Sequence, residues 1–230
     1  MQIEIQLKPG SAIAKVHLEA GEVVTSEGGA MIAMTNNMHI ETTTRQKSGG
    51  GGILSSIKRI LASESIFFNH FTAQNTSGTI YLGTSLPGDM EIFELQGQKK
   101  LLVQAGSYVA SSSGIQLNTV WQGAKNILSG ESFFWVELTG SGQAIINAFG
   151  VIYPIDVDGE YLVDTGHIVA FEDSLSFDIT KAGSSWMSSF LGGEGFVCKF
   201  KGKGRVWCQS HSSNSWGKSM TRNLKAVKKS

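Results

Sequence analysis

Two short sequence signatures occur three times in the same order along this 230-residue chain. The first is an apolar residue three positions before a glycine, followed by β-prone residues, and it spans residues 18–24, 103–109 and 163–169. The second places a glutamate three positions after a leucine, and it spans residues 61–65, 128–132 and 191–195. The chain's three prolines, Pro9, Pro87 and Pro154, each open one unit. Signatures that recur in a constant order predict an architecture built from a triplicated unit.

The composition indicates the kind of unit. Glycine is abundant, with 28 residues, and short β-prone runs alternate with turns rich in Gly, Asn and Ser. This pattern is typical of an all-β sandwich or barrel. We therefore expect one β domain over residues 1–211, with three stacked or ring-arranged units that share a core, at about 1–83, 84–148 and 149–211. A basic C-terminal tail should follow over residues 212–230.

Each unit is predicted to end in a β-hairpin. In residues 196–208, apolar residues alternate with polar ones on both sides of the glycine-containing stretch 201–204, which we interpret as a turn. Residues 134–146 show the same pattern around Gly140-Ser141-Gly142, and the first unit has a version with a longer loop.

The hairpin in the last unit would bring two pairs of side chains together. It would place Cys198 opposite Cys208 in the core, and Lys199 opposite Trp207, close enough for a cation–π contact. Two cysteines are too few for a disulfide framework or a cysteine-built zinc site. A reduced core pair is favoured in the cytoplasm, and a cross-strand disulfide is the alternative.

One short helix interrupts the β pattern. Residues 48–52 read Ser followed by four glycines, which predicts a flexible loop. Residues 53–61 then carry apolar side chains at helical spacing, so we expect one short amphipathic helix inserted in the first unit. Shorter helical or looped versions would occupy residues 120–129 and 183–192.

The charges are balanced in number but not in position. Lys+Arg and Asp+Glu are 19 each, yet no acid follows Glu194 while nine basic residues do. A basic end on an acidic body can meet phosphates, anionic lipid or its own acidic face. Basic and aromatic side chains crowd one stretch that offers material for binding RNA or an anionic membrane surface; they are Lys199, Lys201, Lys203, Arg205 and Trp207.

The chain resembles the family named for altered inheritance of mitochondria, over roughly residues 1–211. The most specific segment is 190–198, which runs into 202–210. The resemblance implies triplicated units of the β-sandwich or double-stranded β-helix kind, like the tryptophan RNA-binding attenuation protein (TRAP). It also implies a ring-like homo-oligomer, with a trimer favoured. No catalytic or ligand-binding residues of that family can be carried over.

The glutamates of the second signature are the strongest polar candidates for a functional site. If a rotation relates the units, Glu64, Glu131 and Glu194 converge on one axis and could bind a cation or a small molecule. The alternative is structural, with each carboxylate accepting backbone N–H groups at a turn. A Gly-x-Ser-x-Gly elbow, a His-Glu-x-x-His run and a P-loop lysine are all missing from the sequence.

These observations favour a non-enzymatic, oligomeric β protein that acts as a scaffold or interaction module. Binding of RNA or anionic lipid at the basic stretch is one alternative, and a site at the repeated glutamates is another. We expect no cofactor and no DNA partner. Because Ile3, Ile5 and Leu7 alternate with polar residues as in a strand, we expect no signal or transit peptide and a cytoplasmic protein.

Overall fold

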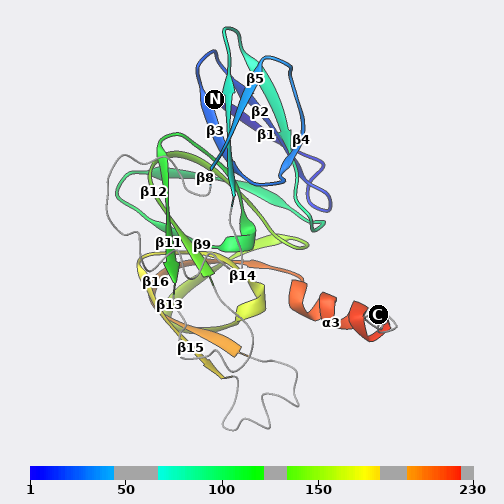
Figure 1. Ribbon diagram of the computed structural model, residues 1–230. Coiled ribbons are helices and arrows are strands. Elements are labelled where there is room, and N and C mark those ends of the chain that lie inside the picture. Colours follow the sequence, from blue (N-terminus) through cyan, green and yellow to red (C-terminus); the bar gives the residue numbers. More distant parts are fainter. Residues whose placement is uncertain (44–66, 122–133, 182–195, 224–230) are drawn as a thin grey trace.

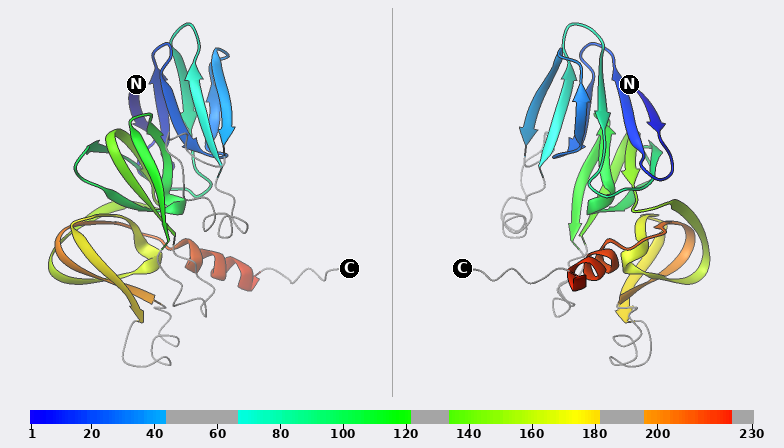
Figure 2. Two further views of the ribbon diagram at one scale, coloured as in Figure 1. Left: turned by 60° about the vertical axis from the view of Figure 1, so that its left-hand side comes forward. Right: turned by 90° about the vertical axis from the view of Figure 1, so that its right-hand side faces the viewer.

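The computed structural model is an elongated arrangement of antiparallel sheets with an α-helix near the C-terminus (Figure 1). The structure describes residues 1–43, 67–121, 134–181 and 196–223. The predicted all-β class is confirmed. Early, middle and late parts of the sequence follow one another along the long axis (Figure 2).

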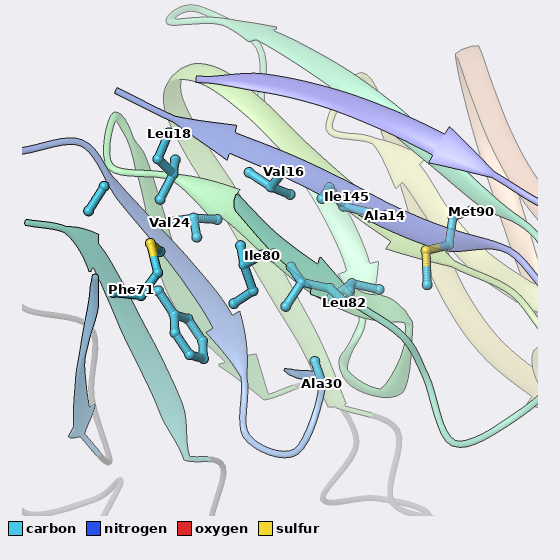
Figure 3. Packing of buried hydrophobic residues seen from close by; sticks show 14 of the residues in the cluster. Ala14, Val16, Leu18, Val24, Ala30, Phe71, Ile80, Leu82, Met90 and Ile145 are labelled. Atoms are coloured by element: carbon cyan, nitrogen blue, oxygen red, sulfur yellow. The ribbon is translucent and has the colours of Figure 1, made fainter. Parts of the chain in front are cut away.

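The N-terminal part contains two facing groups of strands. A four-stranded sheet has the order β1 (Gln2–Gln6), β2 (Ile13–Leu18), β7 (Gly78–Leu82) and β4 (Met31–Met34). The other group has the order β3 (Val23–Glu27), β6 (Phe68–Ala73) and β5 (Met38–Thr43). Every second residue of β2 is buried, as the period of two requires. Between the groups lie Val16, Leu18, Val24, Phe71 and Ile80 (Figure 3).

The middle part is organised around one long strand. It comprises β8 (Met90–Gln96), β9 (Leu101–Gln104), the 3-10 turn η1 (Ala105–Ser107), β10 (Tyr108–Ser112), β11 (Ile115–Trp121) and β12 (Phe134–Asn147). The first half of β12 pairs with β9 and β11, and its second half pairs with β8 and β10. One strand thus contributes to two groups of strands.

The last part has a similar order of elements, except that the single strand β13 lies where the middle part has β8 and β9. It comprises β13 (Ile152–Asp164), η3 (Thr165–His167), β14 (Ile168–Glu172), β15 (Leu175–Lys181) and β16 (Phe196–Gln209). Strand β16 pairs with β13 along its length, while β15 pairs with its first half and β14 with its second. A similar order of elements is not a superposition, so the threefold repeat and the three unit boundaries remain predictions.

The predicted hairpins are wrong. Strands β12 and β16 each run on for 14 residues through the glycines that were interpreted as turns. Gly140, Gly142 and Gly202 have φ of 94°, 142° and 127°, a backbone region that favours glycine. These glycines let a continuous strand bend from one group of strands into the next. In the first unit, β6 and β7 also pair with different strands rather than with each other.

Among the described residues, the apolar interior forms three clusters rather than the single shared core that was expected. The first cluster lies in the N-terminal part but includes Val109 and Ile145, and the third lies in the last part but includes Leu102 and Trp135. Neighbouring parts also share strand pairs, because β10 pairs with β3 and β14 pairs with β9. The parts are therefore joined by both backbone hydrogen bonds and apolar contacts.

Residues 213–223 of the predicted tail form the helix α3 (Ser213–Asn223). Its Trp216 packs edge-on against Phe149, with ring centroids 5.9 Å apart. The predicted helix at 53–61 and the loop at 48–52 lie outside the described residues. Within the described part of the chain, no helix has the length and apolar character needed to cross a membrane.

The bend in β12 predicts a difference between two glycine variants. A Cβ added at Gly140 would lie 2.2 Å from the backbone oxygen of Gly114, whereas Gly159, with φ of 102°, has nothing within 4 Å. Gly159→Ala should lower the free energy of unfolding only by the ~1–2 kcal/mol that a side chain costs in a left-handed backbone. Gly140→Ala should lose about 1–3 kcal/mol more through overpacking, and thus unfold at least ~2 °C lower. Thermal denaturation checks this, and equal losses would contradict the close contact.

Candidate functional site

The four basic residues of the predicted polyanion site lie on one face of β16. Alternation along the strand buries Cys198, Phe200 and Val206 and turns the four basic residues outward. Each basic side chain meets a carboxylate of the neighbouring strand β13. The pairs are Lys199 Nζ to Glu160 Oε2 at 2.6 Å, Lys201 Nζ to Glu160 Oε1 at 2.7 Å, Lys203 Nζ to Asp158 Oδ2 at 3.5 Å, and Arg205 Nε to Asp156 Oδ1 at 2.7 Å.

These ion pairs form a ladder between β13 and β16. Hydrogen bonds from Lys199 and Lys201 lower the pKa of the Glu160 carboxyl to about 2. The bond to Asp156 raises the pKa of the Arg205 guanidinium. Each pair is exposed and contributes little to stability by itself. The ladder matters for recognition, because it places the basic end of the chain against its own acidic face.

Trp207 does not meet Lys199, so the predicted cation–π contact is wrong. The two residues are eight positions apart on one continuous strand, a path of about 26 Å. Trp207 instead packs edge-on against Phe93 of β8, with ring centroids 4.9 Å apart. Four of the five predicted site residues therefore form the ladder. The fifth, Trp207, packs between the middle and last parts.

Cys198 and Cys208 are both free and buried. They do not face each other, because the strand that carries them continues instead of turning back. Burial raises the pKa of both thiols to about 12, which leaves them protonated and unreactive at neutral pH. No group of three His, Cys, Asp or Glu side chains in the described ranges could hold a metal ion. Glu64, Glu131 and Glu194 all lie outside the described residues.

Two of the open strand edges carry a pair of adjacent exposed apolar side chains, which the sequence interpretation missed. Within the described residues, β4 pairs only with β7, and β13 pairs only with β16. On β4, Met31 is 39% and Ile32 56% exposed, and on β13, Tyr161 is 46% and Leu162 60% exposed. The two edges lie at opposite ends of the molecule (Figure 1).

The edge of β4 borders a groove of about 540 Å³, lined by residues 11–13, 29–32 and 83–88. Just before β4, the carboxyl group of Glu27 is largely shielded from water, and this burial raises its pKa to about 7. An open backbone edge, exposed apolar side chains and an adjacent groove can together receive an extended segment of protein.

The fold is of the all-β class, built from antiparallel sheets, and β4 and β13 are two of its edge strands. The chain belongs to the family described as Mitochondrial biogenesis AIM24, whose model matches residues 3–211. The resemblance deduced from residues 190–210 is thereby confirmed.

The relatives are themselves uncharacterised. One is an uncharacterized protein of Streptococcus pyogenes serotype M6, 28% identical over 216 residues, which cover 92% of this chain and 86% of the relative. Among solved structures, the chain is similar to the crystal structure of a Streptococcus pyogenes protein that was a structural genomics target. The TM-score is 0.79 and the identity 27%, and the match covers 97% of this chain and 99% of that one.

The raised pKa of Glu27 predicts a pH-dependent stability. Below pH 4.5 the carboxyl is protonated in both folded and unfolded chains. Between pH 4.5 and about 7 the carboxyl loses its proton in the unfolded chain but keeps it in the folded chain. The free energy of unfolding therefore falls as pH rises through this range. Glu27→Gln should therefore raise the melting temperature relative to wild type at pH 8 and much less at pH 5.

Thermal denaturation at both pH values checks the Glu27 prediction. Glu19→Gln, at a side chain 71% exposed, controls for the loss of one negative charge. A melting difference for Glu27→Gln that is the same at both pH values would contradict the assigned burial effect.

Proposed function

We propose that this protein is a non-enzymatic, oligomeric scaffold or interaction module. The observation that carries the proposal is the presence of two open strand edges with exposed apolar side chains, β4 with Met31 and Ile32, and β13 with Tyr161 and Leu162. Unpaired backbone N–H and C=O groups on an edge are a template for another strand. Apolar side chains beside such an edge supply the area that makes pairing favourable.

The arrangement of the edges supports assembly rather than a single docking event. One edge belongs to the N-terminal part and the other to the last part, so a partner bound at one leaves the other open (Figure 2). A molecule with two separated binding edges can link partners into a ring or chain. This is the property that a scaffold requires.

Binding of RNA or anionic lipid at the basic stretch has less support. Phosphate groups would have to displace Asp156, Asp158 and Glu160 from their ion pairs with Lys199, Lys201, Lys203 and Arg205. Counterion release from unpaired cations normally drives such binding, and these cations already have partners. The other alternative, a site at the repeated glutamates, falls on residues that the structure does not describe.

The scaffold proposal predicts self-association. Sedimentation velocity of the full chain at micromolar concentration should show a species larger than the 24.7 kDa monomer. The species should persist at high salt, because Met31, Ile32 and Leu162 on the two edges are apolar. A strict monomer up to ~100 μM, well above the range of stable interfaces, would contradict the proposal.

The ion-pair ladder predicts how the polyanion alternative behaves. Wild-type protein should bind poly(U) weakly at low salt, and Glu160→Gln should bind more tightly because it releases Lys199 and Lys201. Glu4→Gln makes the same charge change at the pair with Lys15, on the N-terminal sheet, and should bind like wild type. A salt titration measures both affinities. Tight, steeply salt-dependent binding by wild type that Lys199→Gln/Lys201→Gln abolishes would favour the alternative.

A further inference from the structure

Three strands share one irregularity in their pairing. In β4, β10 and β14, the register shifts by one residue between the first and third positions of the strand, namely Met31/Ala33, Tyr108/Ala110 and Ile168/Ala170. Each shift occurs against a strand in the corresponding place, β7, the second half of β12 and the second half of β16. Ala33, Ala110 and Ala170 are therefore equivalent positions.

Two of these three strands also pair on their other side. Strand β10 pairs with β3 through Ala110↔Ser26, Ser111↔Thr25 and Ser112↔Val24. Strand β14 pairs with β9 through Ala170↔Val103, Phe171↔Leu102 and Glu172↔Leu101. In both cases the shifted strand of one part docks on the preceding part, in the same register. Strand β4 has no such pair among the described residues.

The receiving strands identify where β4 would dock. Ser26 and Val103 each lie five residues before the first residue of a shifted strand, Met31 and Tyr108. The same spacing before Ile168 leads to Val163 in the second half of β13, which has no such partner within the described residues. The molecule thus has one unused docking strand at one end and one unused receiving strand at the other.

Equivalent residues are buried on the edges that pair within the molecule and exposed on β4 and β13, whose edges have no such partner among the described residues. On the docking side, Ile32 is 56% exposed, whereas its equivalents Val109 and Val169 are fully buried. On the receiving side, Leu162 is 60% exposed, whereas Leu102 is 9% exposed. The same kinds of side chain are covered wherever a neighbouring part is present.

We infer that β4 of one copy pairs antiparallel with the second half of β13 of another copy. The register that continues the two internal docking contacts is Ala33↔Val163, Met34↔Leu162 and Thr35↔Tyr161. A second copy is required because the two edges lie far apart in one molecule (Figures 1 and 2). The contact is head-to-tail, so it closes into a ring or extends as a filament. This inference rests on the proposed self-association and names its interface.

Two edge variants test the interface. Ile32→Lys should block the docking edge and Leu162→Lys the receiving edge, because a lysine opposes edge pairing. Both side chains are more than half exposed, so the fold should survive, as circular dichroism and melting curves would show. Each variant alone should be monomeric by sedimentation velocity. Ile40→Lys, at an exposed residue of β5, is the matched control and should assemble like wild type.

Mixing the two variants tests the head-to-tail geometry. The Leu162→Lys copy retains an open β4, and the Ile32→Lys copy retains an open β13, so an equimolar mixture should form a dimer and nothing larger. If either variant fails to fold, Met31→Lys or Tyr161→Lys replaces it on the same edge. A mixture of folded variants that stays monomeric would overturn the head-to-tail contact.

The register has its own test. Met34→Cys mixed with Leu162→Cys should yield a covalent dimer with a short bis-maleimide, whereas Met34→Cys mixed with Tyr161→Cys should not, since adjacent strand residues point to opposite faces. The native cysteines are buried and leave little background. The reverse preference would overturn the register.

Failure of the interface and failure of the proposed function are distinguishable. If wild type assembles and both lysine variants assemble equally well, the β4–β13 interface is wrong while the scaffold function stands. If wild type is strictly monomeric, the self-associating scaffold falls first and the interface with it.

Discussion

The bend of a continuous strand at glycine is the constraint on which the rest of this structure depends. Strand β12 pairs with β9 and β11 before Gly140 and with β8 and β10 after it, and β16 does the same with its own neighbours around Gly202. A side chain at Gly140 would collide with a backbone oxygen. Because the bend directs one strand into two groups, the middle and last parts each present a docking strand and a receiving strand on different sides. Neighbouring parts can then join edge to edge.

The sequence was sufficient for the fold class and for the alternation of buried and outward residues along β16, but not for the path of the long strands. Apolar or small residues occupy every even position from Phe196 to Cys208, and a period of two runs unbroken through Gly202 and Gly204. A hairpin and a bent strand both satisfy this pattern, since glycine suits a turn and a corner equally. What decides between them is β13, which pairs with both halves of β16 at once. That contact is long-range, and no local window of sequence contains it.

The same limit explains the outcome at the predicted site. The sequence grouped Lys199, Lys201, Lys203 and Arg205 in one stretch, and local alternation along β16 puts them on one face. Their partners lie some 40 residues earlier in the chain, and only the register of β13 on β16 brings them into contact. The open edges were harder still to predict. Ile32 differs little from Val109 and Val169 in sequence, and it is exposed where no described strand pairs with the outer edge of β4.

Charge and apolar exposure divide β13 into two functional halves. Asp156 and Asp158 precede Gly159, and a bare row of carboxylates there would repel most approaching strands. The ladder with Lys203 and Arg205 neutralises that row without making it apolar, so this half remains a solvated surface. Beyond Gly159, Glu160 is paired with Lys199 and Lys201, and Tyr161 and Leu162 are exposed and uncharged. The second half of β13 is also the half whose counterparts in β3 and β9 already receive a strand, and pairing there would remove the exposed apolar area of Tyr161 and Leu162 from water.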